Sequence, residues 1–299
     1  MTRILLLLFF CLFGTQAFSQ TLKAMLDEYQ TSTGEKKTNL LPAIAREYFL
    51  LRDFKSATQY AERGIQDGLG SQKFMIVAES ATLLGDIYAS NQDKNEALKA
   101  YIQAVSAYDK QEGSKIPPSL YEKLGDLYFQ WKVYPKAISY YEKAINGSSV
   151  LDRGELAENI AVCYLQQKNY GSANRYFENA LQNYKSAQSF KKAISVLNHL
   201  ASLSYINKQL PKAIEYNQQI IELSKRSNDI LSQAKALNNI GYLYQVQGDK
   251  TQAIRFLNDA LTIYRQTNDK SIGTILLNLG NLQISQKDGN PRKLFQEAI

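Results

Sequence analysis

The sequence predicts an all-α protein, a solenoid of stacked antiparallel helix pairs. A glycine or alanine recurs every 36 to 40 residues, and an alanine follows each of the first six by twelve residues. Two helices and their turns fill such a period, and helices approach closely where small side chains meet. The small residues are Ala45, Gly85, Gly125, Ala161, Ala201, Gly241 and Gly280, and the alanines that follow are Ala57, Ala97, Ala137, Ala173, Ala213 and Ala253. We expect these positions to be helix crossings.

An aromatic column accompanies the small residues and supports the same fold. A tyrosine stands three positions after five of the seven small residues, where Ser204 and Gln283 are the exceptions. Three residues along a helix lie one turn away on the same face. The fifth repeat also has Asn217 and Ile220 at expected aromatic and alanine positions, and the seventh has lost its second-helix alanine. We expect these two repeats to pack less well than the others.

The first nineteen residues form a segment of a different kind. Arg3 precedes an unbroken apolar run over residues 4–13, and Ala17 and Ser19 supply small residues before a cut at Gln20. This order is typical of a secretory signal peptide. Ten apolar residues are too few to span a bilayer as a helix, and no later segment comes closer, so we expect no membrane span. The alternative is a retained N-terminal anchor.

The two ends of the array differ. Leu22, Met25, Leu26 and Tyr29 form a helical stripe, which predicts an N-terminal capping helix within residues 20–38, before an array over residues 39–299. The other end stops with Leu294, Phe295, Ala298 and Ile299 on a face with no polar cap. We expect this open face to self-associate, or the chain to be truncated there. The glycines between Gly64 and Gly70 are interpreted as a turn that ends a helix.

Two repeats carry a motif that resembles a known family. Gly85, Tyr88, Ala97, Tyr101 and Ala104 match the pattern of the tetratricopeptide repeat, and the third repeat matches through Gly125, Tyr128, Ala137, Tyr141 and Ala144. The resemblance covers six full repeats and a degenerate seventh, at a period of about 40 rather than the usual 34. It implies a right-handed superhelix whose concave groove binds a protein or peptide.

Composition and motifs argue against catalysis and nucleic-acid binding. The formal net charge is +7, but the basic pairs lie far apart among acidic residues, so we expect no nucleic-acid partner. No metalloprotease, nucleophile-elbow or phosphate-loop motif is present. Cys163 shares a column with leucines and isoleucine, which predicts a buried thiol. We therefore expect no enzyme activity, no cofactor and no metal, including at the single histidine, His199.

The inner face of the first helices carries a candidate ligand groove. Asn159, His199, Asn239 and Asn278 each stand two residues before a small residue, and Asn198 and Asn238 lie beside them. An amide both donates and accepts hydrogen bonds, as the backbone of an extended peptide requires, and the family resemblance implies this use of Asn159, Asn238, Asn239 and Asn278. His199 departs from that pattern. The alternative is that these amides bond neighbouring helices.

Charge along the same face predicts a direction for the ligand. The early repeats place acidic residues there, whereas the sixth repeat has Asn238 and Tyr242; the acids are Glu79, Asp86, Glu122, Asp126, Glu155 and Glu158. We expect a ligand that is basic at one end, unless these acids only form a solvated helix face.

These features predict a non-catalytic scaffold of the bacterial cell envelope that binds an extended protein or peptide segment. The alternative function is the extracytoplasmic sensor region of a membrane signalling protein, a histidine kinase or regulator. That alternative rests on the resemblance of exported repeat arrays to such sensor regions.

Overall fold

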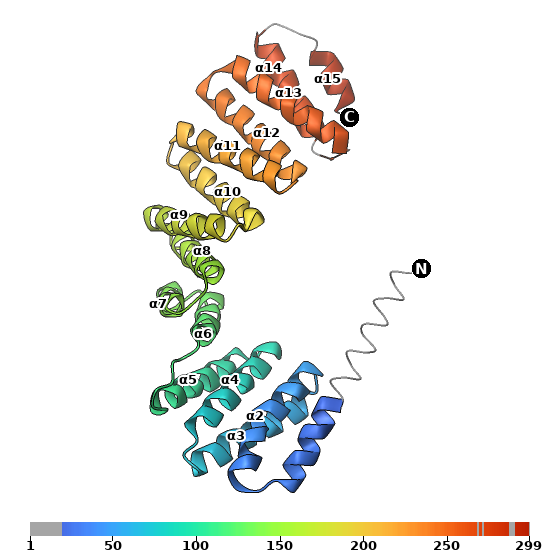
Figure 1. Cartoon of the computed structure of the whole chain (residues 1–299). Coiled ribbons are helices and arrows are strands. Elements are labelled where there is room, and N and C mark those ends of the chain that lie inside the picture. Colours follow the sequence, from blue (N-terminus) through green and yellow to red (C-terminus); the bar gives the residue numbers. More distant parts are fainter. Residues whose placement is uncertain (1–19, 268, 271, 287–290, 299) are drawn as a thin grey trace, which may run out of the picture. The chain divides into compact units, whose positions relative to one another are not determined.

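The computed structural model describes residues 20–267, 269–270, 272–286 and 291–298 (Figure 1). The signal-peptide prediction for residues 1–19 and the prediction for Ile299 lie outside these residues. Every regular element in the described part is a helix, which confirms the predicted all-α solenoid class. None of the described helices is both long enough and apolar enough to cross a membrane.

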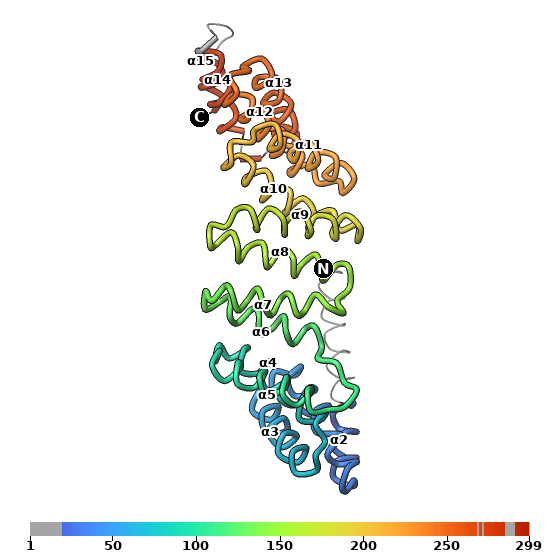
Figure 2. The backbone as a smooth tube through the Cα atoms, turned by 90° about the vertical axis from the view of Figure 1, so that its left-hand side faces the viewer, coloured from blue at the N-terminus to red at the C-terminus, as the bar shows by residue number. Residues whose placement is uncertain are grey.

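The chain forms two compact units, one ending at Ala144 and the other beginning at Ile145. Within each unit, helices that follow one another in sequence lie side by side (Figure 2). The first unit contains a helix over residues 20–31, α2 (Gly34–Leu50), α3 (Phe54–Gly70), α4 (Phe74–Ser90), α5 (Lys94–Lys110), α6 (Pro118–Gln130) and α7 (Tyr134–Ile145). The second contains α8 (Val150–Gln166), α9 (Tyr170–Ser186), α10 (Phe190–Ile206), α11 (Leu210–Arg226), α12 (Ile230–Gln247), α13 (Lys250–Thr267), α14 (Ile272–Gln286) and α15 (Pro291–Glu297).

Most helices are joined by turns of three residues whose middle residue is left-handed without being glycine. Arg52 has φ 60° and Lys208 has φ 58°, and the same conformation recurs at Gln72, Gln92, Lys132, Lys168, Gln188 and Asn228. In each turn the following N–H bonds back to the helix, as Asp53 N–H does to the Tyr48 carbonyl at 3.0 Å. This bond satisfies a carbonyl that the helix end would otherwise leave free.

The small residues make room for large side chains on the paired helix. A Cβ added to Gly125 would lie 2.6 Å from ring atoms of Tyr141, and one added to Gly85 would overlap the Tyr101 ring. These contacts support the predicted crossings. The atoms nearest to the added Cβ belong to a residue sixteen positions on, because the missing side chain leaves room for a ring there. At Gly241 the alanine twelve positions on, Ala253, also lies close, with its carbonyl 3.2 Å from the added Cβ. Ala97 and Ala137 are fully buried beside these contacts.

Two boundaries differ from those predicted. The capping helix ends at residue 31 and α2 begins at Gly34, five residues before the predicted start of the array. The glycines from Gly64 to Gly70 lie inside α3 and do not form a turn. Gly64 and Gly68 are buried because side chains of α4 fill the space above them, Ser80 over Gly64 and Val77 over Gly68.

The C-terminal face is not open as predicted. Leu294, Phe295 and Ala298 are half-buried, and Leu294 and Ala298 pack against the core of the last repeats. The Phe295 ring lies over Gly280, so α15 repeats the contact of glycine with a ring that is seen in the second and third repeats. Arg265 of α13 also pairs with Glu297. The residues of this face therefore pack on the preceding repeat rather than standing fully exposed, because α15 keeps the ring contact although the second-helix alanine is lost. Self-association through this end stays a prediction.

Candidate functional site

Helix α10 presents one polar stripe to solvent. Its exposed residues Lys191, Ser195, Asn198, Ser202 and Tyr205 are spaced by four and three positions, which keeps them on one helical face. The opposite face is buried in the core. Helix α12 repeats the stripe with Lys235, Asn239, Tyr242 and Val246. The second unit therefore exposes an inner face made by neighbouring first helices of its repeats.

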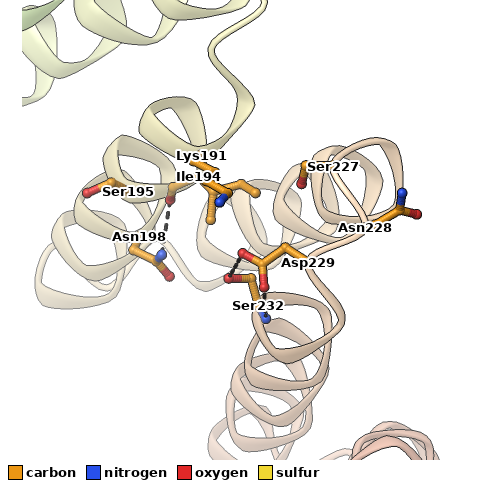
Figure 3. A pocket seen from close by; sticks show the side chains of 8 residues that line it. All are labelled: Lys191, Ile194, Ser195, Asn198, Ser227, Asn228, Asp229 and Ser232. Atoms are coloured by element: carbon orange, nitrogen blue, oxygen red, sulfur yellow. Dashed lines mark hydrogen bonds between the residues drawn. The ribbon is translucent and has the colours of Figure 1, made fainter. Parts of the chain in front are cut away.

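Three adjoining pockets hollow this inner face. The Glu155 pocket, of about 260 Å³, is lined by Glu155, Glu158, Asn159, Tyr184, Lys192 and Ser195. The Asp229 pocket, of about 550 Å³ (Figure 3), is lined by Lys191, Ile194, Ser195, Asn198, Ser227, Asn228, Asp229 and Ser232. The Asn217 pocket, of about 330 Å³, is lined by Asn198, Ala201, Ser202, Tyr205, Ile206, Asn217, Asn239, Tyr242 and Leu243. Ser195 and Asn198 are shared between neighbours, so the three form one groove from α8 across α10 to α12.

The fifth repeat lacks two large side chains that other repeats have, and the groove is hollow beside one of these positions. Asn217 stands at the position that Tyr101, Tyr141, Phe177 and Leu257 hold in other repeats. Ser224 stands where Tyr108, Tyr184 and Tyr264 stand. Both Asn217 and Ser224 are buried. Asn217 lines a pocket, because its small polar side chain leaves unfilled part of the volume that larger side chains occupy elsewhere, whereas Ser224 lines none of the three pockets.

Amides and tyrosines set the chemistry of the Asn217 pocket. The Asn217 amide donates to the Ala213 carbonyl at 2.8 Å, and its oxygen accepts from the Asn239 amide at 3.2 Å. The hydroxyls of Tyr205 and Tyr242 lie 2.9 Å apart at the mouth, and this hydrogen bond raises the pKa of Tyr242. None of the residues lining this pocket carries a formal charge.

The acids of the second unit are already bound within the protein. Glu155 pairs with Lys192 of α10. Glu158 accepts a hydrogen bond of 2.6 Å from the Tyr184 hydroxyl, and burial followed by this bond raises the pKa of Tyr184. Glu155 and Glu158 do line a pocket, as predicted, but their charges are neutralised or hydrogen-bonded before a ligand arrives.

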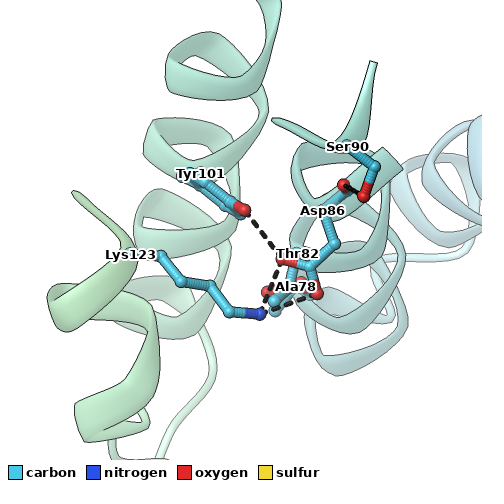
Figure 4. A network of polar contacts seen from close by, with 6 residues as sticks. All are labelled: Ala78, Thr82, Asp86, Ser90, Tyr101 and Lys123. Atoms are coloured by element: carbon cyan, nitrogen blue, oxygen red, sulfur yellow. Dashed lines mark hydrogen bonds and ion pairs between the residues drawn. The ribbon is translucent and has the colours of Figure 1, made fainter. Parts of the chain in front are cut away.

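The acids of the first unit serve its own packing. Asp86 accepts from the Tyr101 hydroxyl at 2.7 Å and pairs with Lys123 of α6 at 2.6 Å (Figure 4). Asp126 accepts from Tyr141 at 2.7 Å. Glu79 and Glu122 are half-buried on α4 and α6. A tyrosine of the paired helix thus reaches both Asp86 and Asp126, and contact of these two acids with a basic ligand stays a prediction.

The polar residues predicted to line the groove from two positions before each small residue do not all line its pockets. Asn159 and Asn239 line pockets, but the His199 ring stacks on Phe177 at 4.8 Å between ring centres. The Asn238 side-chain oxygen is buried without a hydrogen-bond partner in the described part of the chain, and Asn278 on α14 lines none of the three pockets. The alternative interpretation holds for Asn239, whose amide bonds α11. Asn198 and Tyr242 line pockets of the groove, and their contact with a ligand stays a prediction.

Sequence reasoning missed several groove residues. Ser195 and Ser202 link or line the pockets, and Tyr205 pairs with Tyr242. The spacing of four and three residues along α10 could have identified them as one stripe. Asn217 was recognised as a departure from the repeat pattern, and this departure creates the pocket.

Comparisons of sequence agree with this architecture. A model described as tetratricopeptide repeat matches residues 192–266, and one described as soluble NSF attachment protein matches residues 29–154. The chain is 28% identical to human tetratricopeptide repeat protein 21B over 279 residues, which cover 85% of this chain and 20% of that protein. It is 35% identical over 104 residues to a heat shock protein sti1 homolog of Schizosaccharomyces pombe, covering 33% and 18% of the two chains. The chain thus spans about a fifth or less of these relatives.

Solved structures share the fold. The C-terminal part of a repeat-containing protein from Cytophaga hutchinsonii superposes with a TM-score of 0.64 at 17% identity, covering 84% of this chain and 92% of that one. A signal transduction ATPase with a tetratricopeptide repeat sensor from Pyrococcus horikoshii gives 0.64 at 19% identity, covering 83% and 39%. The tetratricopeptide repeat model thus matches part of the chain, and these structures show that the chain shares their fold.

Proposed function

We propose that this protein is a non-catalytic scaffold that binds an extended segment of a partner protein along the inner face of its second unit. The observation that carries the proposal is the continuous groove, in which Ser195 and Asn198 join three pockets across α8, α10 and α12. A groove with several side-chain pockets suits a peptide that lies across the helices.

The polar stripe of α10 suits a peptide backbone. Asn198 donates to the Ile194 carbonyl at 3.0 Å, which orients the amide and leaves its oxygen for a ligand N–H. The Asn239 oxygen is available in the same way on α12. Two oriented amides on neighbouring helices favour a chain with regularly spaced hydrogen-bonding groups. The carboxylates of the groove already have partners, which favours binding over proton transfer.

Export to the bacterial cell envelope is part of the proposal and rests on the sequence of residues 1–19. Fractionation followed by N-terminal sequencing should find the protein in the envelope, beginning near Gln20. An intact Met1 in the cytosol would contradict export. The alternative function, a sensor region of a membrane signalling protein, requires the reading frame to continue into a hydrophobic span, and sequencing of the downstream DNA decides this point.

Site-specific photocrosslinking tests the groove itself. A benzoylphenylalanine at Ser195 or Ser202 lies on the exposed inner stripe, whereas one at Gln218 lies on the exposed outer stripe of α11. We expect one partner to crosslink in living cells from Ser195 and Ser202 and not from Gln218. Equal crosslinking from all three positions, or crosslinking from Gln218 alone, would refute a groove on the inner face.

Removal of the two oriented amides provides the quantitative test. Asn198→Ala with Asn239→Ala removes hydrogen bonds of about 1 kcal/mol each, so the affinity for the crosslinked partner should fall by about tenfold or more. Because the groove charges are internally paired, binding should depend weakly on salt. An unchanged affinity in a folded double variant would contradict the proposed use of the amides.

A further inference from the structure

We propose that the partner inserts a tyrosine side chain into the Asn217 pocket, where it takes the place of the ring that the fifth repeat lacks. This inference rests on the proposed peptide-binding function and specifies the residue that the groove selects. It follows from the register of the repeats, from the polar groups at matching positions and from the absence of charge in the lining.

The register gives the position of the missing ring. In the second repeat, Tyr101 lies against Gly85, and its hydroxyl reaches the next residue, Asp86. The corresponding residues of the fifth repeat are Asn217, Ala201 and Ser202. All three line one pocket of about 330 Å³. The hollow therefore lies where other repeats place their own aromatic side chain. Ala201 adds a Cβ that Gly85 lacks, but the fourth repeat pairs Ala161 with the buried ring of Phe177 in the same register.

Hydrogen-bonding groups are also matched in register. The Tyr101 hydroxyl in the second repeat donates to Asp86, which is held in turn by Lys123, two residues before Gly125. In the pocket, Ser202 replaces Asp86 and Asn239, two residues before Gly241, replaces Lys123. A hydroxyl that entered with the ring would meet Ser202 and the Asn239 oxygen, and both can bond a neutral phenol.

The lining discriminates against other side chains. A lysine, arginine, aspartate or glutamate would lose its hydration in a pocket whose walls offer no opposite charge. A phenylalanine would fill the volume but bring no hydrogen-bonding group to the Ser202 hydroxyl and the Asn239 oxygen, whose contact with water it would displace, and such a loss weakens binding. Tyrosine combines the ring with a polar end.

Blocked tripeptides provide the binding test. Purified ¹⁵N-labelled protein is titrated with N-acetyl-Ala-Tyr-Ala amide and with the same peptide carrying Phe or Lys, while the side-chain amide signals of Asn217 and Asn239 are followed by NMR. We expect saturable shifts with the tyrosine peptide, binding at least about tenfold weaker with phenylalanine, and no saturation with lysine. Equal binding of the phenylalanine peptide, or no response of these amides to tyrosine, would overturn the inference.

Two variants separate pocket filling from loss of folding. Ala201→Gly with Asn217→Tyr rebuilds the contact of the second repeat, so it should fill the pocket from within and abolish the tyrosine-dependent shifts. Ser202→Ala changes an exposed residue, and should remove the preference for tyrosine over phenylalanine while phenylalanine binding stays. Gln218→Ala is the matched control and should change neither. Tyrosine binding retained by the double variant, or an unchanged preference in Ser202→Ala, refutes the inference.

The same variants distinguish this inference from the proposed function. If the partner still crosslinks from Ser195 and Ser202 but the filled pocket leaves its affinity unchanged, the groove binds a partner without a tyrosine in this pocket. If the tyrosine peptide binds but no partner crosslinks, the pocket is real and the proposed function fails. Self-association that is lost on filling the pocket would identify a second copy as the source of the side chain and contradict a separate partner.

Discussion

The second and fifth repeats share one backbone plan and differ in what fills it. In both, two helices of seventeen residues are joined by a three-residue turn. The second repeat fills its interior with Tyr101, which packs against Gly85. In the fifth repeat, Asn217 and Ala201 hold these two positions and line the Asn217 pocket. The comparison teaches that a helical repeat changes from structural unit to candidate binding site by exchanging a few side chains in fixed register.

The exchange has an energetic cost for the fifth repeat. The hydroxyls of Ser204 and Ser224 are buried and have no hydrogen-bond partner among the described residues, although tyrosines stand at these positions in several other repeats. An unpaired buried polar group costs about 1 to 3 kcal/mol. The second repeat has one such hydroxyl in its described residues, that of Ser80, so the fifth repeat carries the larger cost.

The largest expected effect is the loss of stability caused by a substitution at Gly85 in the second repeat. Gly85→Leu would force a side chain into the Tyr101 ring, and overpacking of this kind should cost about 3 kcal/mol of unfolding free energy. Urea denaturation followed by circular dichroism measures the change. Gly171→Ala is the control, because nothing lies within 4 Å of the added Cβ, and it should not destabilise. A Gly85→Leu variant as stable as wild type would show that the Tyr101 ring does not pack closely against Gly85.

A smaller effect concerns the tyrosine hydroxyls in the two regions. Tyr101→Phe should lower the free energy of unfolding by about 1.5 kcal/mol, because it takes a hydrogen bond from a half-buried carboxylate. Tyr242→Phe removes a bond between two exposed hydroxyls and should cost less than about 0.5 kcal/mol. Thermal and urea unfolding of both variants check the order. A reversed order would show that Asp86 is satisfied by Lys123 alone.

Acid should weaken α12, the helix at one side of the groove, through its N-cap. Asp229 caps α12, and the hydrogen bond from the Ser232 hydroxyl is the main reason that its pKa is lowered. A lowered pKa contributes stability above the unfolded value of about 3.9, and this contribution is lost as the pH falls through the folded value. Asp229→Ala should cost about 1 kcal/mol at pH 7, with a gap that narrows below about pH 4. Ser189→Ala, at a cap without such a bond, should show neither effect.

The smallest expected effect tests whether the turns of the second and fifth repeats have the same conformation and strain. Gln92→Gly and Lys208→Gly each place glycine in a left-handed position, which should raise stability by about 0.5 kcal/mol. The two gains should agree, since both turns have the same conformation. Calorimetry that finds a gain in one turn and a loss in the other would show that the helix ends differ in strain between the repeats.

Much of the fold was predictable because the small residues and aromatic columns record helix contacts that recur every 40 residues. The groove was only partly predictable. Asp86 looks like a groove acid in sequence, yet Lys123, 37 residues away, reaches it. His199 stands in the same sequence column as Asn159, Asn239 and Asn278, but its side chain is a ring, which stacks on Phe177. Such choices depend on which side chains of neighbouring helices meet, and one column of sequence does not record them.

The regular turns have a consequence for how the chain can change in length. Seventeen helical residues and three turn residues make a step of twenty over much of the chain, from α2 to α5 and from α8 to α11. An insertion of twenty residues would exchange the inner and outer helices of everything that follows, whereas forty would restore them. Copying residues 190–229 as a block would therefore leave the following helices on their present faces and add a second pocket in the same register as the first. The chain can thus gain length without disturbing its packing only in steps of whole helix pairs.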